Sequence, residues 1–288
     1  MSATVPIIER AQELLGRYDV LFCDVWGVVH DGRTAYAGAG DAFARFRRRG
    51  GTVLLISNAP MPATWVAHVL DEKGVRRDSW DAIVSSGDMT LAHVAERGMT
   101  RVHHIGTLRD LPLFETMQAA RVPLADAEAI VCTGLVDDRN ETAETYRPLL
   151  EAALARRLPL LCANPDLIVD VGGELLLCAG VIAELYETMG GDVFWGGKPH
   201  LPIYECAMRE AARLRGNMID RGRVLAIGDA VRTDIAGAWA FGLDSLFIGQ
   251  GIHRDEVLRD GSLDPTELER LIVAQTARPI AAMVGVAW

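Results

Sequence analysis

Four short apolar runs, rich in β-branched residues, end abruptly in polar residues or glycine, and each precedes a stretch with helical periodicity. The runs cover residues 20–23, 53–56, 193–195 and 224–227. Short, continuously apolar strands that alternate with helices are typical of a parallel sheet covered on both faces. The pattern therefore predicts an α/β protein.

The intervals between these runs predict a second domain. Thirty-three residues separate Asp24 from Ser57 and 31 separate Lys198 from Asp229, whereas 141 separate Ser57 from Lys198. About thirty residues make one strand-helix unit, and the long interval is enough for an inserted domain. We expect a core of residues 1–82 and 186–288 and an insert of residues 83–185. Further strand candidates at 101–105, 129–132 and 158–162 indicate that the insert is α/β as well.

Helical patterns fill the segments between strand candidates. Residues 201–214 place Ile203, Ala207 and Ala211 on one stripe, with Gly216 as the stop. Residues 142–157 show the same periodicity. Lys198 is therefore expected in the loop between a strand and a helix.

The residues that follow the apolar runs carry the candidate chemistry, because ligands of parallel sheets bind beyond the carboxyl ends of the strands. Two carboxylates there, Asp24 and Asp229, can share a hard cation such as Mg²⁺. The hydroxyl and amide of Ser57 and Asn58 and the ammonium of Lys198 can hold a phosphoryl group. Taken singly, each of these residues is better explained by a helix cap, a turn or a solvated surface than by catalysis. Their order and common placement favour a phosphoryl-transfer site.

The same residues resemble a known family. Asp24-Val-Trp-Gly-Val, Ser57-Asn58, Gly197-Lys198-Pro199 and Gly228-Asp229 with Thr233-Asp234 are similar, in this order, to the four motifs of the haloacid dehalogenase (HAD) superfamily. The resemblance implies a Rossmann-like parallel core with helices on both faces and an inserted α/β cap domain of class II, subtype A. Residues 85–87, 134–137, 164–166 and 197–200 resemble subfamily IIA, the NagD-like and 4-nitrophenylphosphatase-like phosphatases.

The resemblance implies a role for each acidic motif residue. Asp24 would be the nucleophile and would form an aspartyl-phosphate intermediate. Asp24 and Asp229 would ligate Mg²⁺ with the backbone carbonyl of Trp26, and Asp234 would support the metal site. Such a covalent route divides one difficult displacement into two easier ones.

The substrate-binding residues follow from the same resemblance. Ser57 and Asn58 would hold the phosphoryl oxygens, and Lys198 would stabilise charge on the nucleophile and the phosphate. Asn164 and Asp166 in the insert would face the substrate, although an Asn-Pro-Asp sequence is equally typical of a turn.

One position departs from the family pattern. The phosphatases carry a second Asp two residues after the nucleophile, which protonates the leaving group, and this chain has Trp26 there. An indole has no useful pKa and no acceptor, so hydrolysis of ordinary phosphate esters should be slower by roughly 10²–10⁴. His30 is a candidate substitute. Two functions therefore stay open: a Mg²⁺-dependent phosphatase, or a catalytically weak protein that binds phosphometabolites.

Composition and charge limit the classes of partner that the protein is expected to bind. The chain has 288 residues, 50% hydrophobic, and 29 Lys and Arg against 39 Asp and Glu give a net charge of −10. This balance opposes binding to nucleic acid or anionic membranes, so an anionic ligand has to be met by a local site. The motif residues provide such a site, and the family resemblance implies a small phosphorylated substrate. Five scattered cysteines and the absence of a leader pattern in residues 1–15 predict a cytoplasmic protein. The sequence leaves homo-oligomerisation open.

Overall fold

The computed structural model describes residues 4–275 and 277–288. Two compact units make up the chain. The first comprises Met1–Ser57, Ala67–Val84 and Tyr204–Trp288, and the second comprises Asn58–Val66 and Ser85–Ile203. The leader prediction for residues 1–15 falls partly on residues 1–3, which lie outside the described residues.

A six-stranded sheet, counted over the described residues, forms the centre of the first unit. Its order is β15 (Ala281–Met283), β12 (Asp244–Ile248), β11 (Val224–Gly228), β1 (Val20–Cys23), β2 (Thr52–Ser57) and β3 (Ala82–Ser85). Strand β1 runs parallel to both β11 and β2. Every residue of these three strands is buried, as continuously apolar strands covered on both faces require. The predicted α/β core with a parallel sheet is confirmed.

A second parallel sheet forms the centre of the second unit. Among the described residues its order is β10 (Val193–Trp195), β7 (Leu160–Cys162), β6 (Ala129–Cys132), β4 (Arg101–Ile105) and β5 (Ala120–Arg121). Neighbouring strands are parallel throughout. The structure therefore forms strands at all three positions expected within the insert.

The strand before Lys198 does not belong to the core sheet, contrary to the prediction. Strand β10 pairs with β7, and Trp195 lies opposite Cys162. Val193 and Trp195 pack against the buried cluster of the second unit, which the pairing with β7 makes possible. The expected boundary at residue 185 also falls inside helix α7 (Ala179–Thr188), and the second unit continues to Ile203.

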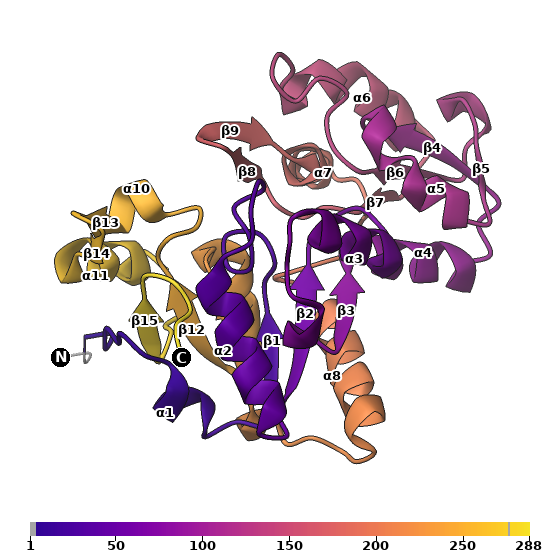
Figure 1. Ribbon diagram of the computed structural model, residues 1–288. Helices are drawn as coiled ribbons and strands as arrows, with labels where there is room; N and C mark the ends of the chain where they lie inside the picture. Colours follow the sequence, from indigo (N-terminus) through magenta and orange to yellow (C-terminus); the bar gives the residue numbers. More distant parts are fainter. Residues whose placement is uncertain (1–3, 276) are drawn as a thin grey trace. The chain divides into compact units, whose positions relative to one another are not determined.

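Helices and short hairpins complete both units. Figure 1 shows helix α2 in front of strand β1. The helices of the described chain are α1 (Gln12–Leu15), α2 (Ala37–Arg48), α3 (Ala63–Glu72), α4 (Ser86–Glu96), α5 (Pro112–Thr116), α6 (Arg147–Ala155), α7, α8 (Leu201–Arg215), α9 (Ala236–Phe241), α10 (Arg254–Val257) and α11 (Pro265–Val273). Two antiparallel hairpins are β8 (Ile168–Val171) with β9 (Glu174–Leu177) and β13 (Leu258–Arg259) with β14 (Ser262–Leu263). Within residues 4–275 and 277–288, none of the helices combines the length and apolar character that crossing a bilayer requires.

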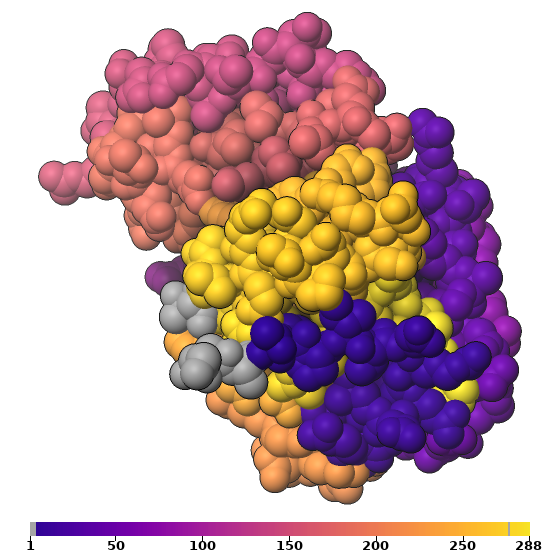
Figure 2. Space-filling model, turned by 90° about the vertical axis from the view of Figure 1, so that its left-hand side faces the viewer, coloured from indigo at the N-terminus to yellow at the C-terminus, as the bar shows by residue number. Residues whose placement is uncertain are grey.

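The C-terminal segment extends the core sheet. Strand β15 pairs in parallel with β12. Residues near the N-terminus bind its other edge: Ala282 N–H donates to Pro6 O at 2.8 Å, and Ile8 N–H donates to Ala282 O at 2.9 Å. Figure 2 accordingly shows the indigo N-terminal residues beside the yellow C-terminal residues. The segment after residue 277, which has no motif of its own, is therefore part of the core.

A buried tyrosine offers a test of the packing in the second unit. Tyr186 is fully buried, and its hydroxyl donates to Leu158 O at 2.6 Å. We expect Tyr186→Phe to lower the free energy of unfolding by about 1–2 kcal/mol, because the carbonyl loses its partner. Urea denaturation measures this, with Leu108→Ala, 80% exposed, as the neutral control. Equal stability of wild type and Tyr186→Phe would contradict the packing described.

Candidate active site

Two aspartates meet at the carboxyl ends of adjacent strands. Cys23, the last residue of β1, lies opposite Ile227 of β11, so Asp24 and Asp229 both emerge where these two strands end. The backbone N–H of Asp24 donates to Ile227 O at 2.8 Å and continues the ladder. The register of two buried parallel strands thus brings together carboxylates 205 positions apart in the sequence.

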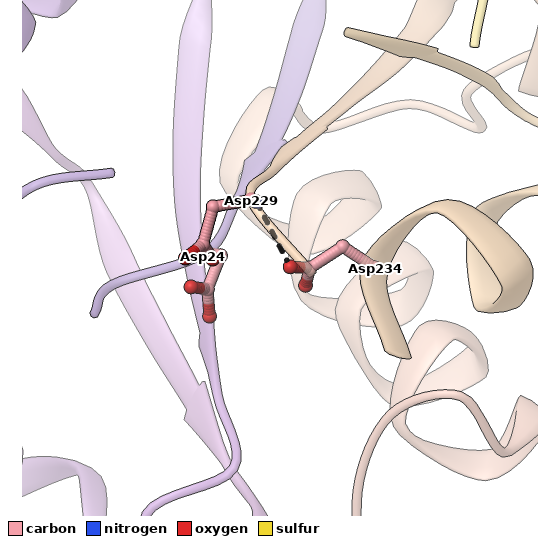
Figure 3. A group of neighbouring side chains, drawn as sticks. All are labelled: Asp24, Asp229 and Asp234. Carbon is pink, nitrogen blue, oxygen red and sulfur yellow. Dashed lines mark hydrogen bonds between the residues drawn. The ribbon is translucent and has the colours of Figure 1, made fainter. Parts of the chain in front are cut away.

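A third carboxylate is held beside them by backbone N–H groups. Asp234 lies on a π-helical turn, Val231–Ile235, and is 4% exposed. Its Oδ2 accepts from the N–H groups of Asp229 at 3.2 Å and of Ala230 at 3.0 Å, and the first of these bonds is dashed in Figure 3. These bonds fix Asp234 and shape the loop that carries Asp229.

The three carboxylates form a group that fits a divalent cation. One oxygen each from Asp24, Asp229 and Asp234 lies within 4.8 Å of the others. Figure 3 shows the side chains gathered at the strand ends. Carboxylate oxygens are the ligands preferred by hard cations, and a Mg²⁺ site commonly uses only one or two of them together with substrate oxygens. The donor set therefore suits a hard divalent ion.

Two residues of this site are not identified by the sequence motifs. The N–H of Ile252 donates to Asp229 Oδ2 at 2.6 Å. A Cβ on Gly251 would lie 1.9 Å from that same oxygen, so only glycine leaves room for the carboxylate. The available signal is the pair Gly249 and Gly251 directly after an apolar strand, since isolated glycines there often mark close backbone approach.

Trp26 packs onto the loop that follows Asp24. Its ring meets the ring of His30 edge-on, with centroids 5.1 Å apart. A Cβ on Gly32 would lie 2.4 Å from the Trp26 ring, so the indole covers this glycine. The chain turns back at this point, because Gly27 N–H donates to His30 O at 2.8 Å. Trp26 therefore has a packing role in the first unit.

His30 is buried and held neutral. It is 2% exposed, and burial, helped by the nearby charge of Lys73, lowers its pKa to about 4. Its Nδ1 accepts from Gly32 N–H at 2.9 Å. A histidine with this pKa is a neutral imidazole near pH 7, and its remaining ring N–H is too weak an acid to protonate a leaving group, which weakens its candidacy as the substitute proton donor.

Ser57 and Asn58 separate at the boundary of the units. Ser57 ends β2 and is 7% exposed, while Asn58 begins the second unit. The Asn58 side chain forms hydrogen bonds within that unit. Its Oδ1 accepts from Lys198 N–H at 2.8 Å, and its Nδ2 donates to Lys198 O at 3.1 Å and to Asp166 Oδ1 at 2.9 Å. The side-chain amide therefore positions the Lys198 loop.

The remaining predicted residues, Lys198, Asn164 and Asp166, lie in the second unit near the Asn58 side chain. Lys198 is 4% exposed and sits between β10 and α8. Asn164 and Asp166 follow β7, and Asn164 Oδ1 accepts from Asp166 N–H at 3.1 Å. This hydrogen bond closes a turn, which is one of the two roles that we expect for the Asn-Pro-Asp sequence. The structure thus brings together Asn58, Asp166 and Lys198 in the second unit and the three aspartates in the first.

Comparison with protein families gives two matches. Residues 21–119 match the family described as haloacid dehalogenase-like hydrolase, and residues 195–272 match the family described as HAD-hydrolase-like. The two matched segments contain Asp24, Ser57, Lys198, Asp229 and Asp234. Residues 120–194, which lie between the two segments, belong to the second unit.

Individual proteins resemble the chain over most of its length. A haloacid dehalogenase-like hydrolase from Brucella suis is 42% identical, with a TM-score of 0.85 over 98% of this chain and 100% of that one. The D-glycerol 3-phosphate phosphatase of Mycobacterium tuberculosis is 30% identical over 253 residues, which are 82% of this chain but only 64% of that enzyme. A 4-nitrophenylphosphatase from Thermotoga maritima, 20% identical with a TM-score of 0.69 over 93% of this chain and 95% of that one, shares the fold.

The buried histidine predicts a pH dependence of stability. The pKa of His30 is about 4 in the folded chain against an ordinary value of 6.5. Between these values the unfolded chain binds a proton that the folded chain does not, so stability falls as the pH drops from 6.5 to about 4. We expect His30 to contribute up to about 3 kcal/mol to this fall. Urea denaturation of His30→Asn should give a flatter curve, and curves parallel to wild type would contradict the assignment.

The Asn58 hydrogen bonds predict how the Lys198 loop is held. Asn58→Ala removes both bonds to the Lys198 backbone, so the Lys198 amide should exchange with solvent at least about tenfold faster, equivalent to about 1.4 kcal/mol of lost protection. Hydrogen exchange read by mass spectrometry or NMR measures this. Asn140→Ala, which removes an exposed bond to Asp137, is the matched control. Unchanged exchange at Lys198 in Asn58→Ala would refute the positioning role.

Proposed function

Because the chain belongs to the haloacid dehalogenase-like hydrolase family, we propose that it is a Mg²⁺-dependent phosphatase of subfamily IIA acting on a small phosphorylated metabolite. The observation that carries this proposal is the group of Asp24, Asp229 and Asp234 at the ends of parallel strands. Carboxylates so close to one another favour a bound divalent cation, and such a cation attracts phosphate oxygens.

The metal site would use oxygen atoms of the first unit. Asp24 and Asp229 would supply carboxylate ligands and Trp26 its backbone carbonyl, with Asp234 supporting the site through its hydrogen bonds to the backbone N–H groups of Asp229 and Ala230. When bound, Mg²⁺ offsets negative charge on the phosphoryl oxygens. We favour Mg²⁺ because the side-chain ligands are carboxylates and lack the nitrogen or sulfur that softer metals prefer.

Asp24 would act as the nucleophile. One of its carboxylate oxygens forms a bond to phosphorus while the bond from phosphorus to the leaving oxygen breaks, which gives an acyl phosphate and an alkoxide or phenoxide. Water then attacks phosphorus, releases inorganic phosphate and restores the carboxylate. Ser57 and Asn58 would hold phosphoryl oxygens, Asn58 through its backbone N–H because its side chain is engaged. Lys198 would offset charge on the phosphoryl group.

The substrate class is supported by the activities of relatives. The similar enzyme from M. tuberculosis acts on D-glycerol 3-phosphate, and the T. maritima protein is a 4-nitrophenylphosphatase. Both names describe phosphate monoesters of small molecules. We propose a small monoester here as well, with Asn164 and Asp166 on the substrate side of the second unit.

Trp26 limits the range of leaving groups. The leaving oxygen needs a proton when its conjugate acid is weak, and neither the indole nor the neutral His30 supplies one. Asp31 is half-buried, and backbone hydrogen bonds from Thr34 and Arg33 hold its pKa below its ordinary value. Aryl phosphates, which leave as stable phenoxides, should therefore react faster than alkyl phosphates.

A second function is favoured by the same residue. The Trp26 ring has its own packing place against His30 and Gly32, so it is a built-in part of the loop. A chain that keeps the metal and phosphate ligands but lacks a proton donor could bind phosphometabolites with little turnover. Such a protein would serve as a sensor.

Turnover of 4-nitrophenyl phosphate with Mg²⁺ separates these functions. We expect wild type to be active and Asp24→Asn to lose activity about a thousandfold or more, because the nucleophile is removed. Asp255→Asn, at an acid whose side chain is 92% exposed, is the control for lost charge. Equal activity of Asp24→Asn and wild type would refute the nucleophile. Inactive wild type that still binds Mg²⁺ would favour the sensor.

Replacement of Trp26 tests the missing proton donor. We expect Trp26→Asp to raise turnover of alkyl phosphates by about 10²-fold or more, because it supplies a general acid. Trp26→Ala loses the same packing without gaining a carboxyl group and is the matched control. If Trp26→Asp and Trp26→Ala behave alike in correctly folded protein, the indole is not what limits hydrolysis.

A further inference from the structure

We propose that the turn Gly251–Arg254, held by the C-terminal strand β15, is a positioning device that sets the carboxylate of Asp229 for metal binding. This inference rests on the proposed metal site. It assigns a role to a turn and a strand that carry no family motif, and it makes Gly251 and Ile252 positioning residues.

The first observation is a hydrogen bond to the carboxylate itself. Ile252 N–H donates to Asp229 Oδ2 at 2.6 Å. A short bond to one named oxygen limits rotation of the carboxylate, so it also sets the direction of the other oxygen. The backbone supplies this donor, and the side chain of residue 252 plays no part in it.

The second observation is the space that Gly251 leaves. A Cβ added at Gly251 would lie 1.9 Å from Asp229 Oδ2 and 2.3 Å from Asp229 Cβ. Gly251 is outside the left-handed region, so its backbone accepts any residue and glycine is needed for the close approach alone. The turn therefore meets the same carboxylate oxygen twice, with the N–H of Ile252 and with the bare Cα of Gly251.

The third observation is the tether. Gly249 N–H donates to Met283 O at 2.9 Å, and Gln250 N–H donates to Val284 O at 2.8 Å. These bonds continue the pairing of β12 with β15 into the turn. Strand β15 is itself bound by the segment around Pro6, so the turn rests on the edge of the core sheet. A firm support is what a residue that positions a ligand requires.

The turn geometry permits a variant that removes the hydrogen bond and keeps the turn. Arg254 N–H donates to Gly251 O at 3.1 Å, and His253 has φ −95° and ψ 11°, the values of the third residue in a type I turn. Ile252 is the second residue of that turn, where proline is favoured. Ile252→Pro thus keeps the turn but replaces the N–H with the ring Cδ, which removes the hydrogen bond and pushes Asp229 Oδ2 out of its position. Ile252→Val keeps both the turn and the N–H.

Mn²⁺ affinity, measured by electron paramagnetic resonance on the full chain, tests the proposal. We expect Ile252→Pro and Gly251→Ala to bind Mn²⁺ about 10–100-fold more weakly than wild type, the usual effect of losing a group that orients a metal ligand. Ile252→Val and Gly222→Ala should bind like wild type. Gly222 is a matched control because a Cβ there makes only ordinary contacts.

Thermal unfolding in EDTA and near-UV circular dichroism separate positioning from folding. Folded Ile252→Pro and Gly251→Ala with wild-type Mn²⁺ affinity would overturn the inference. Loss of the fold in both variants would also overturn it, since the turn would then be holding the sheet together. Wild type that binds no Mn²⁺ or Mg²⁺ would instead refute the proposed function on which the inference rests.

Discussion

Mutual repulsion among three carboxylates is the constraint around which the first unit is built. Oxygens of Asp24, Asp229 and Asp234 lie within 4.8 Å of one another. Two like charges at that distance repel by about 3 kcal/mol at an effective dielectric constant near 20. Backbone N–H groups reduce this repulsion by donating to the carboxylate oxygens. Those of Asp229 and Ala230 donate to Asp234, and that of Ile252 donates to Asp229. The remaining charge is what a divalent cation would offset.

Much of this arrangement could be predicted from the sequence. Asp24, Ser57 and Asp229 follow apolar runs, and the register of parallel strands gathers such residues at one edge. The sequence does not show which sheet contains the strand before Lys198, because a three-residue apolar run looks the same in either sheet. Its partner, β7, is identified only by pairing across about thirty residues. The hydrogen bonds of Asn58 to the Lys198 backbone were equally invisible, since they depend on that pairing.

The turn at Gly251 escaped the sequence motifs for a different reason. Backbone N–H groups occur at every residue except proline, so a sequence does not mark which of them will meet a carboxylate. Trp26 is the reverse case. Its identity alone predicts that the usual proton donor is missing, and the structure adds that the ring packs on His30 and Gly32. The proposed metal site and the predicted lack of a proton donor together define the proposed chemistry.

The response of stability to Mg²⁺ tests the central claim most directly. The free energy of unfolding of wild type should rise with Mg²⁺ concentration, because the ion binds the folded carboxylates and not the unfolded chain. Asp229→Asn, which removes one charge and keeps an acceptor for Ile252 N–H, should be at least as stable as wild type in EDTA and gain less from Mg²⁺. Stability of wild type that is independent of Mg²⁺, or Asp229→Asn that gains as much as wild type, would contradict the account.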